Sequence, residues 1–313
     1  MTPLIRMPKF TEGKRRETPP GPVRGGAKRP DRAIRVYRRV VRIARAALLV
    51  LACVLAVQVL LVAQALRLPR ARVHRLQNSA VRWSIRKLCR ILNMKVRRHG
   101  PLPEQPSLLV TNHISWLDIP ALLSVVDADF VAKQDVGRWP LIGGIAARVG
   151  TIFLERGARD AAKATANDMT WRLAQRRNVI VFPEATTSDG HHVRTFYGRL
   201  YQAAIRTHSP VQAVAIRYPG LDGPAGVAPF IDDDELVSHL WRLLGEKHIV
   251  AELHFCDPIL PNLDRRTLAN RTRDQICAAL DLEPALSQRL SGKFRFPRQK
   301  QPAVRTLDKV AAR

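Results

Sequence analysis

Cysteines, acidic residues and aromatic residues are all scarce in this 313-residue sequence. The four cysteines lie far apart, and no two of them have the Cys-x-x-Cys spacing of a zinc or redox site. This distribution argues against a disulfide framework and a cysteine-bound metal, and it suits a reducing compartment. Aromatic residues make up 6% of the chain, which gives little support for a surface that stacks on single-stranded nucleic acid.

The scarcity of acidic residues leaves a large positive charge. Asp and Glu number 26 against 52 Lys and Arg, and the formal net charge is +26. A charge of this size implies an anionic partner: nucleic acid, anionic lipid headgroups or an acidic substrate. Much of the excess lies in the two ends of the chain and next to the apolar segment described below, and no DNA-reading helix is recognisable. We therefore expect no nucleic-acid partner.

The N-terminal part of the chain changes character twice. Residues 1–40 are rich in Pro, Gly, Arg and Lys, and we expect a disordered basic tail. Residues 46–66 carry no charge and have about the length that crosses a bilayer core, roughly 20 residues. Arginines flank both ends, so a spanning and a re-entrant helix both remain open. Residues 73–96 form a basic amphipathic pattern, which fits a helix at the membrane interface or one packed on the next domain. We assign residues 41–99 to a membrane anchor and interfacial helix.

From residue 100 onward, short apolar runs alternate with helical patterns. The apolar runs are at 107–111, 129–132, 151–154, 179–182, 211–216 and 249–255. The helical patterns are at 119–126, 141–149, 159–177, 198–207 and 266–280. This alternation predicts an α/β fold with a mostly parallel sheet and helices on both faces. The domain would span residues 100–290, followed by a basic C-terminal tail at 291–313.

The stretch TNHISWLDIP, residues 111–120, places His113 five positions ahead of Asp118. On one continuous helix this spacing separates two side chains by about 140° around the axis, so they would not meet. We therefore expect His113 in the turn after a strand and Asp118 in the first turn of the next helix. There the carboxylate would fix the tautomer of the imidazole, which could act as a general base. In the alternative interpretation, Asn112 caps the helix and His113 is a surface residue.

Two further strand ends carry polar residues. GTIFLERG, residues 150–157, ends in Arg156, whose guanidinium is suited to phosphate, although a surface ion pair is the alternative. VFPEATTSDG, residues 181–190, presents Glu184 and Thr186, for which a turn is the alternative. In a parallel sheet the ligand lies at the carboxyl ends of the strands, so these residues could share one site with His113.

Taken in order, these blocks resemble the His-x4-Asp glycerolipid acyltransferases, the class that includes 1-acylglycerol-3-phosphate acyltransferase. NHISWLD stands at the His-x4-Asp block, and residues 131–157 stand at the second block. FPEATTS stands at the third, usually Phe-Pro-Glu-Gly-Thr-x-Ser, and VQAVAI stands at the fourth. The resemblance covers about residues 88–280, and four blocks in the same order make it specific.

The resemblance implies a membrane-bound O-acyltransferase. His113 would remove the proton from the acceptor's hydroxyl, which attacks the thioester of acyl-CoA or acyl carrier protein, and Asp118 would support His113. The implied substrate-binding residues are Arg156, which would hold a phosphate, and Glu184, Thr186 and Lys133. Neither a metal nor a bound cofactor is required. We expect a membrane lipid surface as a partner, at the cytoplasmic side of a bacterial inner membrane.

The acceptor implied is 1-acyl-sn-glycerol-3-phosphate, which would give phosphatidic acid. Two departures from the family pattern bear on this assignment. Ala185 replaces the usual glycine, so the backbone there must accept a Cβ. Thr187 stands where many lysophosphatidate enzymes have arginine, which weakens the case for a phosphomonoester. The Thr-Thr-Ser-Asp-Gly form resembles the acyltransferases that complete ornithine lipids, so lyso-ornithine lipid is the alternative acceptor.

Overall fold

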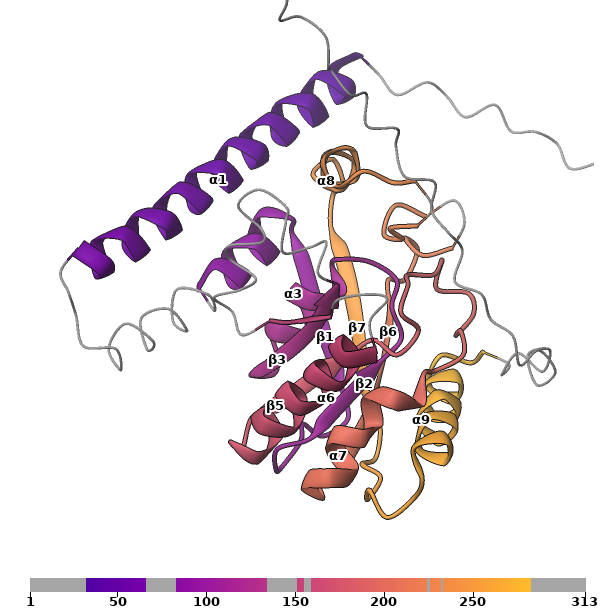
Figure 1. Cartoon of the computed structure of the whole chain (residues 1–313). Coiled ribbons are helices and arrows are strands. Elements are labelled where there is room, and N and C mark those ends of the chain that lie inside the picture. The colour runs from indigo at the N-terminus through magenta and orange to yellow at the C-terminus, as the bar shows by residue number, and fades with distance from the viewer. Residues whose placement is uncertain are drawn as a thin grey trace, which may run out of the picture.

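The computed structural model of the protein describes residues 32–65, 83–133, 151–154, 159–223, 226–231 and 233–282. Its strands are β1 (Met94–His99), β2 (Leu108–Thr111), β3 (Ala128–Lys133), β4 (Ile152–Leu154), β5 (Asn178–Val181), β6 (Val211–Arg217) and β7 (Ile249–Phe255). They form one seven-stranded sheet in the order β1-β7-β6-β2-β5-β3-β4 (Figure 1). Every neighbouring pair is parallel except β6 and β7. The predicted α/β fold with a mostly parallel sheet is confirmed.

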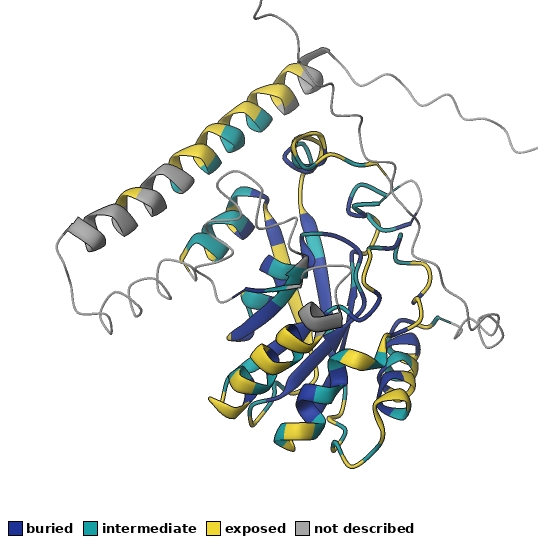
Figure 2. Cartoon of the chain, viewed as in Figure 1, coloured by how far each residue is buried: buried dark blue, intermediate teal, exposed yellow. Residues whose placement is uncertain are grey.

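Helices cover both faces of this sheet, as predicted. The named helices are α1 (Arg32–Ala65), α3 (Asp118–Leu123), α6 (Arg159–Ala174), the 3-10 helix η1 (Gly198–Tyr201), α7 (Gln202–Thr207), α8 (Leu236–Leu243) and α9 (Arg265–Ala279). Alternate residues of the central strands enter two separate apolar cores. One core contains side chains of α3, α8 and a helical segment at residues 83–91, and the other contains those of α6, α7 and α9. The central strands are buried on both sides, which explains their continuous apolar sequences (Figure 2).

The long helix α1 begins at Arg32, inside the range that we predicted as a disordered tail. Val36, Val40 and Ile43 follow one another at helical spacing among the arginines, so this basic stretch can continue the helix. The apolar stretch predicted to be a membrane helix lies in the second half of α1. Among the described residues, the structure contains no helix that is both long enough and apolar enough to cross a membrane. The Arg45 guanidinium donates to the carbonyl oxygens of Leu244 (3.1 Å) and Glu246 (2.7 Å), just beyond α8.

The amphipathic stretch after α1 packs on the domain, at least from residue 83 onward. Ile85, Leu88, Cys89 and Leu92 contribute to the core that contains α3 and α8, which is the second of our two alternatives. The predicted helix through residue 96 is wrong for its last residues. Asn93 adopts a left-handed conformation with φ of 50°, which ends the helix, and Met94–His99 then pair with β7 as β1.

Several predictions concern residues outside the described part of the chain. These are the tail residues 1–31, the first part of the amphipathic stretch at 73–82, the helix at 141–149, Arg156 and the C-terminal tail at 291–313.

Among the described glycines, Gly100, which follows β1, combines a left-handed φ with a close backbone neighbour. Its φ is +79°, and a Cβ atom would lie 2.1 Å from the Phe255 carbonyl oxygen. We predict that Gly100→Ala lowers the free energy of unfolding by about 2–4 kcal/mol, from left-handed strain plus the clash with β7. Gly220→Ala is the matched control, because Gly220 has a φ of +75° but no atom within 4 Å of the added Cβ. It should lose only about 1 kcal/mol. Equal losses in denaturant unfolding would contradict the clash at Gly100.

Candidate active site

The loop between β2 and α3 carries the histidine and begins with a bond to the neighbouring strand. The buried amide of Asn112 donates to the Ile216 carbonyl oxygen (2.9 Å) and accepts from the Ile216 N–H (2.8 Å). The Asn112 side chain therefore extends the hydrogen bonding between β2 and β6 by one residue beyond the end of β2. It does not cap α3. His113 follows in the loop, and Asp118 is the first residue of α3. Both positions are those that the spacing predicted.

The Asp118 carboxylate is completely buried and accepts four hydrogen bonds. Its Oδ2 atom accepts from His113 Nδ1 (2.8 Å) and from the backbone N–H groups of Ile114 (2.8 Å) and Ser115 (3.0 Å). Its Oδ1 atom accepts from the Tyr218 hydroxyl (2.7 Å). Burial and the neighbouring Asp118 raise the pKa of Tyr218 well above its usual value, so Tyr218 stays protonated and donates. A buried carboxylate with this many donors is held in one position.

The His113 ring presents its other nitrogen for chemistry. A carboxylate beside Nδ1 favours the tautomer that carries its proton there, which leaves the lone pair on Nε2. No residue in the described part of the chain forms a hydrogen bond with Nε2. The ring stacks on Phe182 with 4.0 Å between ring centroids, and 19% of the side chain is exposed. The site therefore holds an oriented imidazole that solvent and a substrate can reach.

The Glu184 carboxylate supports the backbone on which His113 stands. It is 3% exposed, and its two oxygens accept from the N–H groups of His113 (2.8 Å) and Arg194 (2.9 Å). The His113 carbonyl oxygen in turn accepts from the Ser188 N–H (2.8 Å). Burial raises the pKa of Glu184 to about 7, although the two backbone donors act in the opposite direction. The resemblance implied that this glutamate positions the acceptor, but in the structure both of its oxygens bond to the protein backbone.

The two departures from the family pattern have structural roles. Ala185 has a φ of 59°, the left-handed region that favours glycine and costs an alanine about 1–2 kcal/mol. The Thr187 hydroxyl donates to the Phe230 carbonyl oxygen in a short hydrogen bond. The Phe230 N–H donates to the Ile114 carbonyl oxygen (3.0 Å), so Thr187 is linked to the loop that carries His113. Thr186, by contrast, is exposed.

The remaining predicted residues are not brought into this site by what the structure describes. Lys133 is the last residue of β3, but the structure does not describe its side chain. Arg156 lies wholly outside the described residues. Sequence reasoning missed Tyr218, which directly follows β6 at the end of the fourth block. A general signal existed, because the carboxyl ends of parallel strands meet at one sheet edge, but the adjacency of β6 and β2 that brings Tyr218 to Asp118 is known only from the structure.

Sequence reasoning also missed the contact between the loop and α8. The Trp116 indole N–H donates to His239 Nδ1 (3.0 Å), and His239 Nε2 bonds to the Pro229 carbonyl oxygen (3.0 Å). Burial lowers the pKa of His239, and a neutral ring with its proton on Nε2 satisfies both bonds. Trp116 thus fixes the middle of the loop to the buried side of α8.

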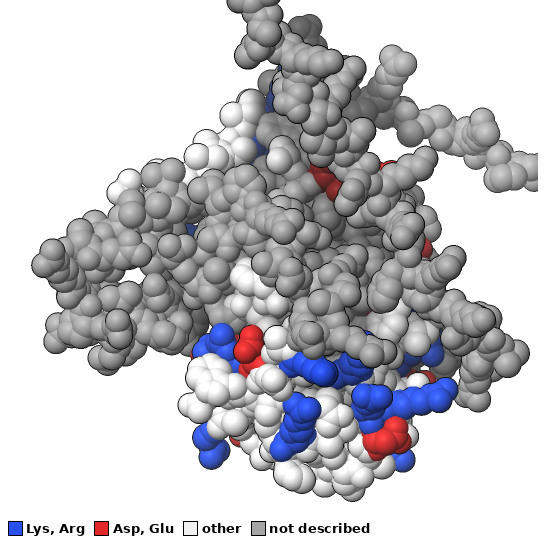
Figure 3. Space-filling view, viewed as in Figure 1, with Lys and Arg blue, Asp and Glu red and all other residues white. Residues whose placement is uncertain are grey.

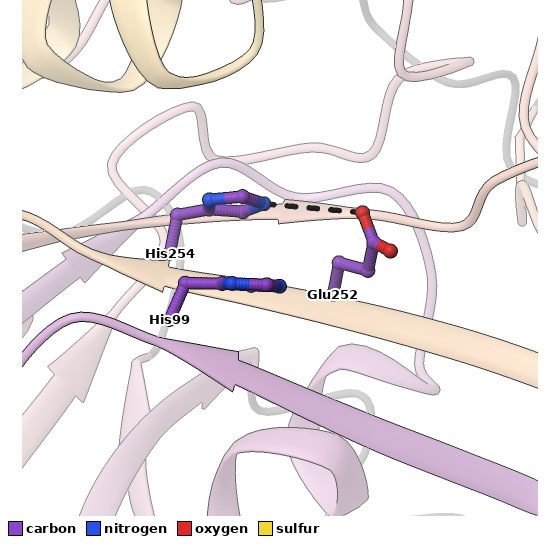
Figure 4. A group of neighbouring side chains, drawn as sticks. All are labelled: His99, Glu252 and His254. Atoms are coloured by element: carbon purple, nitrogen blue, oxygen red, sulfur yellow. Dashed lines mark ion pairs between the residues drawn. The ribbon is translucent and has the colours of Figure 1, made fainter.

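One group of described side chains away from this loop has the composition of a metal site. His99 on β1 and Glu252 and His254 on β7 bring their ligand atoms within 4.8 Å of one another (Figure 4). The two rings stack at 4.5 Å, and His254 Nε2 lies 3.9 Å from Glu252. Both Glu252 oxygens, however, accept from arginines: Arg97 at 3.3 Å and Arg217 at 2.8 Å. Burial opposes the ionisation of Glu252, but these arginines lower its pKa below the usual value. The cluster is therefore an ion-pair network whose carboxylate is already occupied.

Basic side chains gather on the helical face at the end of the domain away from α8. Figure 3 shows Lys and Arg side chains over α6, α7 and α9 with few acidic ones between them. The exposed basic residues there include Lys163, Arg199, Arg206, Arg266 and Arg271. Part of the positive charge therefore lies on the folded domain as well as at the ends of the chain.

Comparisons with known proteins agree on one kind of activity. A family model described as Acyltransferase matches residues 93–217. The lyso-ornithine lipid O-acyltransferase of Pseudomonas aeruginosa is 40% identical over 215 residues, which cover 68% of this chain and 83% of that protein. The 1-acyl-sn-glycerol-3-phosphate acyltransferase of Neisseria gonorrhoeae is 36% identical over 157 residues, 50% of this chain and 62% of that protein. The crystal structure of the 1-acyl-sn-glycerophosphate acyltransferase PlsC of Thermotoga maritima has the same fold, with a TM-score of 0.60 at 18% identity over 79% of this chain and 96% of that one.

Glu184 gives the site a testable pH dependence. Its pKa is raised from the usual 4.5 to about 7, so the folded protein holds this proton more tightly than the unfolded chain does. The resulting stabilisation is complete below about pH 4.5 and is lost as the pH rises through about 7, with a total of roughly 3 kcal/mol. We predict that Glu184→Gln removes this component from the unfolding free energy measured between pH 4.5 and 8. An unchanged pH slope in the variant would contradict the raised pKa.

Proposed function

The chain belongs to the acyltransferase family, and from that premise we propose the reaction that it catalyses. It transfers a fatty acyl group from acyl-CoA or acyl carrier protein to the free hydroxyl of a membrane lysolipid. His113 acts as the general base. The relatives make it a lysolipid acyltransferase. The observation that carries the proposed role of His113 is the 2.8 Å bond between its Nδ1 and the buried Asp118, which leaves the lone pair of Nε2 free of any bond to the described residues.

The proposed reaction needs one base and no covalent enzyme intermediate. Nε2 of His113 accepts the proton of the acceptor's hydroxyl while the oxygen attacks the thioester carbonyl carbon. When the tetrahedral intermediate collapses, the carbon–sulfur bond breaks and the imidazolium returns the proton to the departing thiolate. Asp118 stabilises the imidazolium between these steps and keeps its own negative charge.

The cysteines give a further reason to favour direct transfer. Burial raises the pKa of Cys89 and of Cys256 to about 11, so both stay protonated thiols at neutral pH. A thiol is a far weaker nucleophile than a thiolate, so neither residue is suited to carry the acyl group. The proposed enzyme uses no metal and no bound cofactor.

Two acceptors fit the proposal. Lyso-ornithine lipid is favoured for two reasons. Thr187 adds no positive charge that could bind a phosphomonoester, and its hydroxyl is already bonded to Phe230. In addition, the match to the Pseudomonas relative covers more of that protein's length than the match to the Neisseria relative does. The specific reason to retain 1-acyl-sn-glycerol-3-phosphate is Arg156, which stands in the second block where the family binds phosphate. Either acceptor would come from a membrane, and we place the catalytic domain on the cytoplasmic side of the bacterial inner membrane.

One assay tests both the base and the acceptor. We predict that His113→Ala lowers acyl transfer by about 10²–10⁴-fold, because the proton acceptor is removed. The thermal midpoint should also fall, because Asp118 loses one donor and Phe182 its stacked ring, but the variant should remain folded at the assay temperature. The wild type should have a higher kcat/KM with lyso-ornithine lipid than with lysophosphatidate under the same conditions. Substantial activity in His113→Ala would exclude the general base, and a preference for lysophosphatidate would reverse the choice of acceptor.

Tyr218 should act through Asp118. We predict that Tyr218→Phe lowers kcat about tenfold, because Asp118 loses the donor that fixes its second oxygen.

Tyr201→Phe is the matched control for Tyr218→Phe. Tyr201 is equally buried and loses a comparable bond, 2.6 Å to the Thr272 hydroxyl, but it lies in the other apolar core. It should lower the thermal midpoint by a similar amount and leave kcat unchanged. Two variants with the same kinetics would reduce Tyr218 to a packing residue.

A further inference from the structure

The short helix α8 has two faces with opposite surroundings. Its inner face is buried through His239 and Leu243. On the outer face, Val237 is 77% exposed and Trp241, one turn later, is 42% exposed. Residues four apart lie on the same side of a helix, so these two apolar side chains form one exposed pair. An exposed tryptophan beside an exposed aliphatic residue calls for a partner more than single apolar residues do.

The inner face of α8 is joined to the catalytic loop by several contacts. Trp116, midway between His113 and Asp118, donates to His239 at 3.0 Å. The Phe230 ring meets the His239 ring edge-on at 5.2 Å between centroids, and the Phe230 backbone N–H bonds to Ile114 in the same loop. The outer face of α8 is therefore connected to the His113 loop through the buried side of the same helix.

The segments next to the outer face carry charges of both signs, and Asp233 and Glu235, just before α8, are exposed. Lys247 and His248, which follow α8, are exposed. Arg45 of α1 bonds to the carbonyl oxygens at the end of α8, so the two helices are connected there.

Figure 2 shows exposed residues along the side of α1 that faces away from the domain. The described side chains of α1 include exposed large apolar ones such as Ile43 and Leu51. A tryptophan beside an aliphatic side chain is typical of a segment at a membrane interface, so the exposed apolar pair supports a lipid contact here without help from the mixed charges around it.

We propose that α8 is a membrane-contact helix of the catalytic domain, with Val237 and Trp241 inserted among the lipids of a bilayer. This contact brings the His113 loop to the surface from which a lysolipid arrives. The inference rests on the proposed function for that consequence, but the lipid contact can be measured without any reaction. A second copy of the chain is a poorer occupant, because a stable dimer buries about 800 Å² on each partner and this pair of side chains is far smaller.

Quenching by brominated lipids tests the contact directly. The full-length protein is reconstituted into phosphatidylcholine–phosphatidylglycerol vesicles in which brominated-chain phosphatidylcholine replaces the ordinary lipid. The chain has five tryptophans, and we expect Trp241→Phe to reduce the quenched fraction of their fluorescence. Trp171→Phe is the matched control, since Trp171 is 57% exposed but lies on α6, on the other face of the sheet. Its removal should not reduce the quenched fraction.

Unchanged quenching in Trp241→Phe overturns the proposal. If Trp241 were covered by a second copy, quenching would be unchanged and Trp241→Asp would lower the mass of the protein in detergent, which also overturns it.

Kinetic measurements on variants of Trp241 and Trp171 test whether the lipid contact of α8 helps a membrane lysolipid to reach the site. Trp241→Asp should raise the apparent KM for a long-chain lysolipid in vesicles roughly tenfold, about the effect of losing one buried apolar side chain. It should leave the KM for a short-chain lysolipid dissolved as monomers unchanged, and Trp171→Asp should change neither. Equal rises for both substrates overturn the role of α8 in lipid access. If the wild type acylates no lysolipid, the proposed function fails, while the quenching result still decides whether α8 contacts lipid.

Discussion

The structure depends on keeping one ionised carboxylate in a place that water does not reach. Asp118 is buried in an apolar core, where an unpaired charge would cost several kcal/mol. Four donors make this position possible, and they come from the imidazole of His113, two backbone N–H groups of the loop and the hydroxyl of Tyr218. Each donor is fixed by the need to satisfy Asp118. The orientation of His113 is therefore a result of folding and does not wait for a substrate.

The sheet provides the geometry that lets these donors converge. β2 lies between β5 and β6, so the loop after it is bordered by the segments that follow both neighbours. From the β6 side, Asn112 is bonded to Ile216, and Tyr218 reaches Asp118. From the β5 side, Glu184 and Ser188 hold the two sides of the His113 peptide. The loop is thus fixed from both flanking strands, as expected at the carboxyl edge of a parallel sheet.

Much of this could be predicted from the sequence, because the central strands and the His113 spacing leave local signals. Buried parallel strands give continuous apolar runs, and the expected run at 249–255 coincides with β7. β1 was missed because its sequence, MKVRRH, has few apolar residues; it lies at the edge of the sheet, where only one side is buried. The contacts of Tyr218 and His239 join residues about 100 or more positions apart, and no local pattern encodes such pairs. The bonding of Glu184 to the backbone was hidden for the same reason.

The third block illustrates how a sequence motif can change without loss of the site. Glu184, Thr187 and Ser188 all bond to the first block or to the segment packed on it. Their contacts with the backbone need an acceptor or a donor of the right length, not a particular charge, so threonine at 187 keeps the scaffold intact. The left-handed Ala185 shows that even the glycine of the motif is replaceable at a modest cost in strain. Since this block is used to hold His113, a substitution within it is tolerated where the contacts with the backbone are kept.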